Sequence, residues 1–240
     1  MKMIISDYDG TIKRFTEKPS LLENIDLKKD VNSISNFIKK GNKFVISTKR
    51  VTSSILEEIK QYKIDYNYLI SHGGLVSFDK NGKLLYANYL EEKLINFLKE
   101  INYKTDMIKQ IDCFDAYNNT SFDKKDYILI GLVVKDIKEM LKKIKQIQAE
   151  INIHCSYNIK KNKIWLHNEV SKNEGITNLL QNIPETLKQK DIITIGDSIN
   201  DLSMINEYDG YCIENGEIDK YYIGKVKSIP NIRKLIRKIK

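Results

Sequence analysis

The first strand of the chain ends in two aspartates, and this feature constrains the fold more than any other. A short apolar run, Met3-Ile4-Ile5, is typical of a buried strand, and Asp7-Tyr8-Asp9-Gly10-Thr11 comes soon after it. Strand side chains alternate between faces, so Asp7 and Asp9 can point into one crevice beyond the carboxyl end of the strand. Open parallel sheets bind their ligands at that edge. The sequence therefore predicts an acidic site there, where Gly10 allows a sharp turn.

Two carboxylates one residue apart repel each other unless a cation or a proton lies between them. A Ca²⁺ loop of the EF-hand kind also begins Asp-x-Asp, but it needs further oxygen ligands at fixed spacing. Thr11, Ile12 and Lys13 do not match that pattern. An acidic turn that only closes a strand is the remaining alternative from this stretch alone.

Composition favours a globular protein with ample material for a core. The chain has 240 residues, of which 41% are hydrophobic and 30% are charged. The apolar runs are too short for a membrane span, and the N-terminus does not fit a secretory signal. Cys113, Cys155 and Cys212 lack the spacing of a zinc site or a disulfide framework. We therefore expect free thiols and a reducing, cytoplasmic location.

The net charge of +8 raises the alternative of nucleic-acid binding. Lysine is spread along the whole chain, however, and no recognition motif accompanies it. We expect a solvated, lysine-rich surface, no nucleic-acid partner and no membrane partner. The positive field would attract small anionic substrates.

Strands and helices alternate at both ends of the sequence. Apolar strands are predicted near 3–7, 44–46, 68–70 and 191–195, and amphipathic helices near 31–40, 54–62 and 172–182. This alternation is typical of an α/β fold with a doubly wound, Rossmann-like parallel sheet. A basic helix over 231–240 is expected to dock on that sheet rather than on a membrane.

The middle of the chain follows another pattern. A hairpin over 75–86 turns at Asn81-Gly82, and helices are predicted from 89 and from 136. Further strands are expected at 127–134, 151–157 and 164–166. We interpret this block as an inserted α+β cap. The predicted domains are a core at 1–82, the cap at 83–167 and the second part of the core at 168–240.

Polar residues follow the predicted core strands and open one core helix. Because the carboxyl ends of parallel strands share one edge, these distant residues can converge there: Asp7, Asp9, Thr48, Lys172, Asp197 and Asp201. Their types suit phosphoryl transfer. A carboxylate nucleophile needs a divalent cation beside it, a second carboxylate can transfer protons, and a lysine and a hydroxyl can hold phosphate oxygens.

In this order, the motifs resemble those of the haloacid dehalogenase-like (HAD) superfamily, in its Cof-type, subfamily IIB sugar-phosphatase branch. The stretch from Asp7 to Thr11 resembles the first motif, Thr48 the second and Lys172 the third. Gly196-Asp197-Ser198-Ile199-Asn200-Asp201 resembles the fourth. The insertion falls between the second and third motifs, where that branch carries its cap.

The resemblance implies a role for each matched residue. Asp7 is expected to be the nucleophile that forms an aspartyl-phosphate, and Asp9 the general acid and base. Mg²⁺ is expected at the Asp7 side chain, the Asp9 main-chain carbonyl and Asp197, with Asp201 bound to the ion or supporting it. Phosphate binding is expected from Thr48, Lys172, Lys49 and Gly10, with Asn200 in a supporting role.

Two positions depart from the family pattern. Lys49 stands where the family commonly has glycine, and its side chain adds bulk and charge near the mouth of the site. His72 stands where the family usually has asparagine, and a structural role is favoured over a substrate contact. The cap would set specificity, with candidate contacts at Tyr117, His154, Trp165 and His167, although burial in the cap core is the favoured prediction for Trp165.

The sequence therefore predicts a cytoplasmic, Mg²⁺-dependent phosphatase, a phosphoric monoester hydrolase acting on a small phosphorylated metabolite such as a sugar phosphate. We expect a monomer or a homodimer. Two alternatives stay open: a phosphomutase with the same chemistry, and a catalytically idle protein that binds a phosphorylated metabolite.

Overall fold

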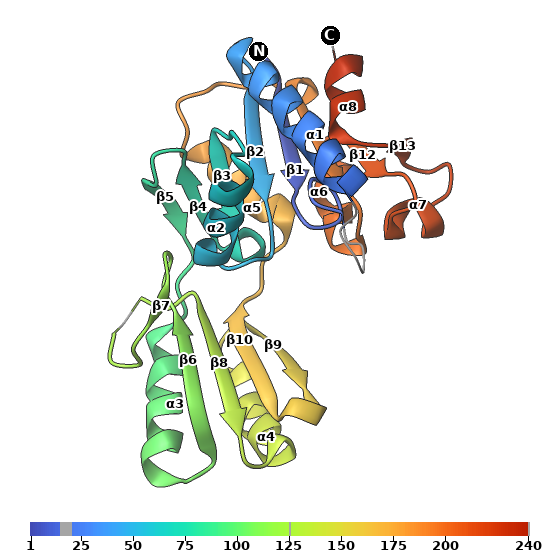
Figure 1. Ribbon diagram of the computed structural model, residues 1–240. Helices are drawn as coiled ribbons and strands as arrows, with labels where there is room; N and C mark the ends of the chain where they lie inside the picture. The colour runs from blue at the N-terminus through green and yellow to red at the C-terminus, as the bar shows by residue number, and fades with distance from the viewer. Residues whose placement is uncertain (15–20, 125, 240) are drawn as a thin grey trace. The chain divides into compact units, whose positions relative to one another are not determined.

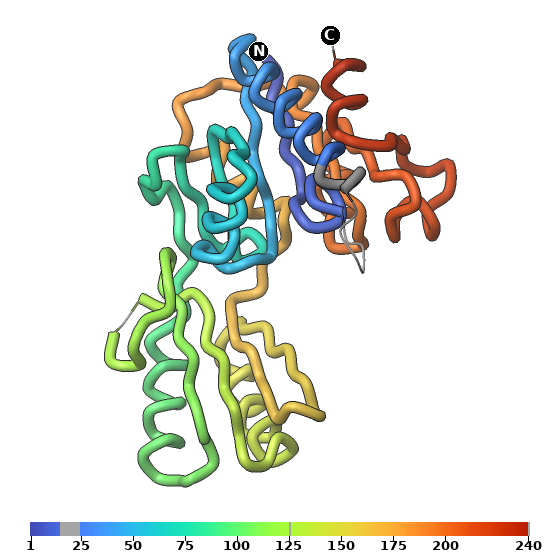
Figure 2. The backbone as a smooth tube through the Cα atoms, viewed as in Figure 1, coloured from blue at the N-terminus to red at the C-terminus, as the bar shows by residue number. Residues whose placement is uncertain are grey.

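The computed structural model of the chain describes residues 1–14, 21–124 and 126–239, which form two compact units. The core unit comprises residues 1–50, 54–86 and 171–240, and the inserted unit comprises 51–53 and 87–170. Figure 2 shows the blue and red ends of the chain together in the core unit, with the green and yellow middle in the other. The predicted boundaries differ from these divisions by a few residues. Lys240, the last residue of the predicted terminal helix, lies outside the described residues.

The core unit is built on one sheet with the strand order β13-β12-β11-β1-β2-β3-β4-β5. The strands from β13 to β3 run parallel, and β4 runs antiparallel to β3. Their bounds are β1 (Met3–Asp7), β2 (Lys43–Ser47), β3 (Tyr68–Ser71), β4 (Val76–Asp79), β5 (Leu84–Ala87), β11 (Ile192–Gly196), β12 (Asp209–Ile213) and β13 (Lys227–Ile229). The predicted α/β class is confirmed, with a sheet that is mixed but mostly parallel.

Helices cover both faces of this sheet. Figure 1 shows α1 and α2 on the near face and α5 behind it. The core helices are α1 (Leu21–Lys39), α2 (Thr52–Tyr62), α5 (Lys172–Gln181), α6 (Leu202–Glu207), α7 (Glu217–Tyr221) and α8 (Ile232–Lys238), with short 3₁₀ turns η1 (His72–Gly74), η3 (Gln189–Asp191) and η4 (Ile199–Asp201). On the far face, Ile5 and Val45 pack with Ile176 and Leu179 of α5. Burial on both faces explains why β1 is a continuous apolar run rather than an alternating one.

The hairpin over 75–86 corrects one expectation. We predicted that its second strand begins the inserted domain, but both β4 and β5 extend the core sheet beyond β3. Ser71 pairs with Val76 and Tyr68 pairs with Asp79, so the turn after β4 lies at the opposite edge from the carboxyl end of β3. Sequence pattern locates a hairpin, but it does not say which sheet the hairpin joins.

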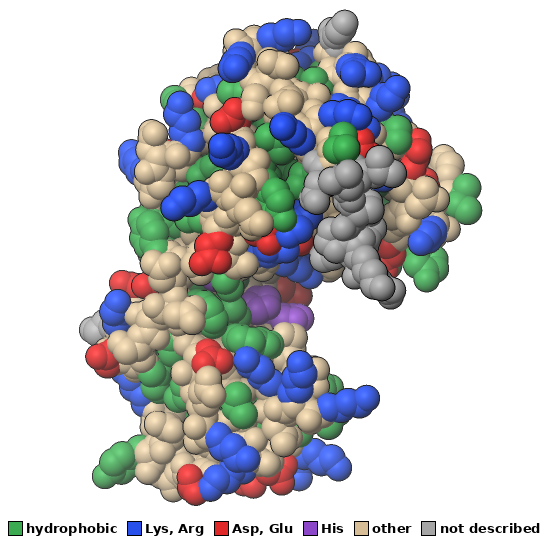
Figure 3. All heavy atoms as spheres, in the orientation of Figure 1, with side chains coloured by type: hydrophobic (Ala, Val, Ile, Leu, Met, Phe, Trp, Pro, Cys, Tyr) green, Lys and Arg blue, Asp and Glu red, His purple; other side chains and the backbone are tan. Residues whose placement is uncertain are grey.

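The terminal helix α8 docks in the core unit. Ile232 and Leu235 are buried, and the Arg233 guanidinium lies 2.9 Å from Asp26 of α1. Among the described residues, no helix combines the length and the apolar character needed to cross a membrane. On the face drawn in Figure 3, lysine and arginine side chains are scattered over the surface.

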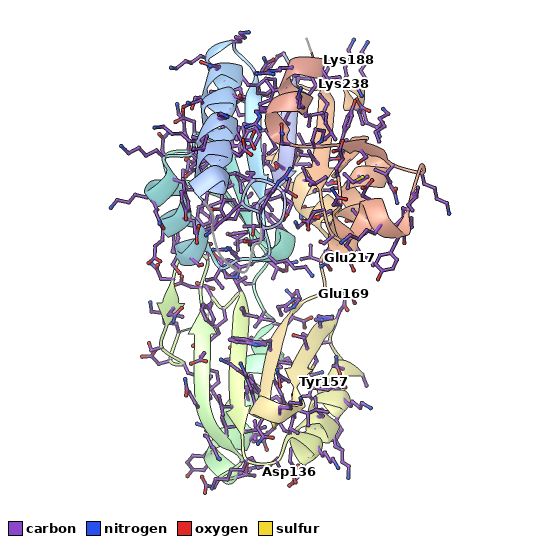
Figure 4. The ribbon with its side chains drawn as sticks, turned by 45° about the vertical axis from the view of Figure 1, so that its right-hand side comes forward. Asp136, Tyr157, Glu169, Lys188, Glu217 and Lys238 are labelled. Atoms are coloured by element: carbon purple, nitrogen blue, oxygen red, sulfur yellow. The ribbon has the colours of Figure 1, made fainter. Side chains whose placement is uncertain are left out.

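The inserted unit is a five-stranded antiparallel sheet with the order β7-β6-β8-β10-β9. Its elements are α3 (Glu92–Lys104), β6 (Ile108–Phe114), β7 (Asn119–Thr120), β8 (Leu129–Val134), α4 (Ile137–Gln148), β9 (Ile153–Asn158), η2 (Ile159–Lys161) and β10 (Lys163–Asn168). Asp136, labelled in Figure 4, caps α4 by accepting bonds from the amides of Lys138 and Glu139. Buried side chains of both helices pack with the sheet in one hydrophobic cluster.

Strand β6 is the element that the sequence did not indicate. Its burial does not alternate, and the register with β8 shifts between Ile108 and Gln110. A bulge of this kind places one extra residue on the strand and breaks the period of two by which strands are recognised.

Helix α5 approaches the backbone of η1 through two glycines. A Cβ atom on Gly175 would lie 2.5 Å from the Cα of Gly74, which has a φ of 120°. This close approach fixes the first turn of α5, and with it Lys172, against the end of β3.

We predict that Gly175→Ala destabilises the protein. Alanine in place of a helical glycine ordinarily stabilises by about 1 kcal/mol, so a loss would have the opposite sign. Backbone atoms cannot yield as a side chain would, and we expect a loss of about 1–3 kcal/mol in urea unfolding. Thr177→Ala, at an exposed position of the same helix, is the control and should be neutral or stabilising. Equal effects of the two variants would contradict this account.

Candidate active site

The candidate site lies at the carboxyl edge of the core sheet. Asp7 ends β1 and pairs with Ser47 of β2, while Ser6 pairs with Ile195 of β11. The loops that follow these three parallel strands therefore begin side by side. They carry most of the predicted site residues, and Lys172 begins α5 in the same unit.

Lys172 joins two carboxylates in the interior. Its Nζ contacts Oδ1 of Asp7 and lies 2.6 Å from Oδ1 of Asp201. Lys172 is 4% exposed, Asp7 5% and Asp201 0%. Ser171 caps α5 in a reciprocal capping box with Glu174. The cap lies one residue before Lys172, so the helix begins at the lysine.

The loop after β11 holds Asp201 from its other side. Asp201 Oδ2 accepts hydrogen bonds from the amides of Asp197 (3.1 Å) and Ser198 (3.0 Å) and from the Ser198 hydroxyl (3.2 Å). One oxygen of Asp201 thus faces the loop, and the other faces Lys172. This geometry explains why an aspartate stands four residues after Asp197.

Three carboxylates come together at this point. One oxygen from each of Asp7, Asp197 and Asp201 lies within 4.8 Å of the others. Hard divalent cations such as Mg²⁺ and Ca²⁺ take oxygen ligands of this kind. Three carboxylates facing the single ammonium of Lys172 leave two negative charges unbalanced, which is the charge that a divalent ion would neutralise. The residues present therefore fit a divalent metal site.

Gly10 is required by the same cluster. It has a φ of 83°, and a Cβ atom at this position would lie 2.2 Å from Oδ2 of Asp197. The next residue, Thr11, is buried and donates its hydroxyl to Oδ1 of Asp197 at 3.3 Å. The first motif thus positions the third carboxylate, a contact that the sequence did not indicate.

The pKa values reflect this crowding. Burial, together with repulsion from Asp201 and Asp197, raises the pKa of Asp7 to about 7, although Lys172 opposes the shift. Burial and the nearby Asp201 also raise the pKa of Asp197. For Lys172, burial alone would lower the pKa, but attraction to Asp7 and Asp201 outweighs it, and the net direction is upward. We infer that Lys172 stays charged.

Asp9 is held outside the carboxylate cluster. Its two oxygens accept hydrogen bonds from Arg50, at 2.7 Å from Nε and 2.6 Å from a terminal nitrogen. Glu58 of α2 binds Arg50 at 3.1 Å and also accepts hydrogen bonds from Tyr8 and Lys13. The sequence did not identify Arg50 as the partner of Asp9, nor Glu58 as a partner of Arg50. The Asp9 main-chain carbonyl stays a prediction as a metal ligand.

The residues after β2 line the same edge. Thr48 is buried, and its hydroxyl accepts a hydrogen bond from the Arg50 amide at 3.1 Å. Lys49 is exposed, and its Nζ donates to Oδ1 of Asn200 at 2.7 Å. Partial burial and repulsion from Lys172 lower the pKa of Lys49.

His72 directly follows β3 and has a φ of 52°. Asparagine adopts this left-handed region more readily than most residues, which explains its place in the family pattern. The His72 side chain is largely buried, and its amide donates to the Arg50 carbonyl at 2.9 Å. Its position is consistent with the structural role that we favoured.

The candidate specificity residues lie in the inserted unit. Trp165 is half-buried, contacts Phe114 with ring centroids 6.0 Å apart and covers Gly131, so it is not the core residue that we favoured. His154 and His167 are paired on neighbouring strands, with ring centroids 4.8 Å apart. Tyr117 is exposed.

The mostly parallel sheet thus carries a cluster of carboxylates and a lysine at its carboxyl edge, where open sheets of this kind bind their ligands. The sequence matches the haloacid dehalogenase-like hydrolase family over residues 4–122 and 99–219. The chain belongs to this family.

Several known proteins are similar to this chain. An uncharacterized protein from Mycoplasma capricolum subsp. capricolum is 28% identical, covering 86% of this chain and 88% of its own length. A haloacid dehalogenase-like hydrolase from Bacteroides thetaiotaomicron has a TM-score of 0.72 at 18% identity, covering 100% and 99% of the two chains. The HAD subclass IIB sugar phosphatase BT4131 has a TM-score of 0.64 at 15% identity, covering 99% and 98%. These structures share the fold.

We predict that Mg²⁺ stabilises the protein more at about pH 8.5 than at about pH 5.5. The Asp7 pKa rises from 3.8 to about 7 on folding, so the folded state binds this proton more tightly than the unfolded chain. Between these pKa values, rising pH therefore lowers the stability of the metal-free protein. An ion that binds the ionised cluster opposes this loss, and protons compete with it at low pH.

The measurement is the change in Tm on adding Mg²⁺ at the two pH values. In Asp7→Asn the change should be smaller and should depend less on pH, because the ligand whose pKa is raised to about 7 is gone. An equal increase in Tm at both pH values in the unmodified protein would contradict the prediction.

Proposed function

We propose that the protein is a Mg²⁺-dependent phosphatase that hydrolyses a small phosphorylated metabolite through an aspartyl-phosphate on Asp7. The buried cluster of Asp7, Lys172, Asp197 and Asp201 carries this proposal, because it provides a nucleophile, a cation and metal ligands at one point. Membership of the hydrolase family supports it. The cytoplasmic location expected from the free cysteines stays a prediction.

In the proposed first step, a carboxylate oxygen of Asp7 attacks the phosphorus atom. A bond forms between Asp7 and phosphorus while the bond to the leaving oxygen breaks. Asp9 donates a proton to that oxygen, so the product leaves as a neutral alcohol. The charge on the phosphoryl oxygens is the main barrier to this attack, which is why positive groups must surround them.

In the second step, a water molecule attacks the phosphorus of the aspartyl-phosphate. Asp9, now a carboxylate, accepts a proton from the water, and the bond between Asp7 and phosphorus breaks. Inorganic phosphate leaves, and both aspartates return to their starting states. One residue therefore serves as acid and then as base.

The remaining residues hold the phosphoryl group. Lys172 has an ammonium with three donors, and Thr48 has a hydroxyl at the same edge. We propose further contacts from the amides of Lys49 and Gly10, with Asn200 supporting the site. Asp7, Asp197 and Asp201 would hold the metal ion, which supplies positive charge to the phosphoryl oxygens and relieves repulsion among the carboxylates.

Asp9 must leave its present contacts to transfer a proton. Arg50 occupies both of its carboxylate oxygens with two hydrogen bonds. We propose that Asp9 turns from Arg50 toward the leaving group when substrate binds. Arg50 is then a positioning residue, which Glu58 in turn orients.

A sugar phosphate is the substrate class that we favour. The similar structure named as a sugar phosphatase supports this choice by analogy of fold. Half-buried Trp165 and the pair of His154 and His167 are the proposed specificity contacts of the inserted unit.

We predict that Asp7→Asn abolishes phosphate release while the protein remains folded. The amide is a poor nucleophile, so the covalent step cannot begin. Release would be measured from p-nitrophenyl phosphate and a panel of sugar phosphates, with Mg²⁺ and with EDTA. Circular dichroism would serve as the control for folding. Retained activity in the variant would exclude the proposed mechanism, and tight binding without turnover by the unmodified protein would indicate an idle binding protein.

A separate prediction concerns Asp9→Asn. p-Nitrophenolate leaves without a proton, so the first step should survive in this variant, whereas the second step lacks its base. We therefore expect a burst of about one p-nitrophenol per protein, followed by turnover slowed about 10²–10⁴-fold. A sugar phosphate, whose alkoxide needs a proton, should give no burst. Equal slowing of both substrates without a burst would rule out this role for Asp9.

A further inference from the structure

Lys49 has only a neutral partner at the candidate site. Its ammonium donates to the Asn200 side-chain oxygen at 2.7 Å. Within the described parts of the chain, no carboxylate forms an ion pair with it. An ammonium has three donors, so two of them are left for a ligand. Lysine on a solvated surface needs no partner, but this one lies at the edge of a charged cluster.

With a divalent ion bound, the other charges of the site would be matched. Lys172 is paired with Asp7 and Asp201, and a divalent ion would balance the remaining carboxylate charge. In the neighbouring cluster, Arg50 and Lys13 face two carboxylates, Asp9 and Glu58. Lys49 is therefore the cation left over when the residues of the site are paired.

The position of Lys49 differs from that of Lys172. Lys172 is buried beside the nucleophile, whereas the Lys49 side chain is exposed. Asn200, which holds the Lys49 ammonium, directly precedes Asp201, and Lys49 directly follows Thr48. The backbone next to Thr48 and the side chain of Asn200 therefore both hold the ammonium at the edge of the proposed phosphate site. It lies outside the groups proposed to contact the transferred phosphoryl.

We propose that the Lys49 side chain binds a second anionic group of the substrate. The substrate class would then be phosphate monoesters that carry a carboxylate or another phosphate near the ester, such as sugar-acid phosphates or bisphosphates. This inference rests on the proposed phosphatase function. Asn200 keeps the ammonium in place before the substrate arrives, which reduces the entropy lost on binding.

Matched ligand pairs test this proposal. 3-Phosphoglycerate and glycerol 3-phosphate differ by a carboxylate in place of a hydroxymethyl group, and fructose 1,6-bisphosphate and fructose 6-phosphate differ by one phosphate. We would measure kcat/KM for each ester with Mg²⁺, and binding of each ester to the Asp7→Asn protein by calorimetry. The unmodified site should prefer the more anionic member of at least one pair.

Lys49→Met, which removes the charge and keeps the length, should reduce that preference about tenfold or more, because hydrogen bonds between charged groups are lost. Lys49→Arg should retain most of it. Lys80→Met is the matched control, because it removes the same charge at the turn after β4, at the opposite edge of the sheet. This control should keep the preference of the unmodified protein.

Each outcome decides the proposal. Equal losses for both members of a pair in Lys49→Met would mean that Lys49 contacts only the transferred phosphoryl, and this would overturn the proposal. So would a site with no preference for the more anionic ligands. If no ester is hydrolysed under any condition, the phosphatase function fails, and the calorimetric preference and its response to Lys49→Met still decide the role of Lys49.

Discussion

The site depends on one buried interaction, the Lys172 ammonium between Asp7 and Asp201. Removing these charges from water costs several kcal/mol per ion, and the mutual attraction offsets this cost only while all partners are in place. Asp7 ends the central strand, Lys172 begins α5, and Asp201 closes the loop after β11. The charge cluster therefore connects three segments that are distant in the sequence. Its carboxylates outnumber its one ammonium, so a bound cation would stabilise it.

Close backbone approach makes this arrangement geometrically possible. Gly10 leaves room for the Asp197 carboxylate, and the contact between Gly74 and Gly175 seats the first turn of α5. A second cluster, formed by Asp9, Arg50, Glu58 and Lys13, lies beside the first and pairs two carboxylates with two cations. The proposed nucleophile and the proposed acid thus lie two residues apart in the chain but have separate ionic partners, as two different roles require.

Most of the core could be predicted from the sequence because its signals are local. Apolar runs indicated β1 and β11, and amphipathic patterns indicated α2 and α5. The shared edge of parallel strands implied that Asp7, Asp197 and Lys172 meet. The pairing of Arg50 with both Asp9 and Glu58 had no local signal, since it depends on where α2 packs. Strand β6 was missed because a bulge disrupts its alternation. Trp165 was misjudged because it lies on the opposite face of β10 from the buried Ile164 and Leu166, where it is only half-buried.

The strand order also has a consequence for biosynthesis. β1 is synthesised well before β11, which fills one of its two hydrogen-bonding edges and is made only after the whole inserted unit. Until then the nascent core has an open, apolar strand edge, the kind of surface that aggregates or recruits chaperones. The inserted unit has its own buried cluster and can fold during this interval. An insertion at this point in the chain therefore prolongs the time during which the edge of β1 is unpaired.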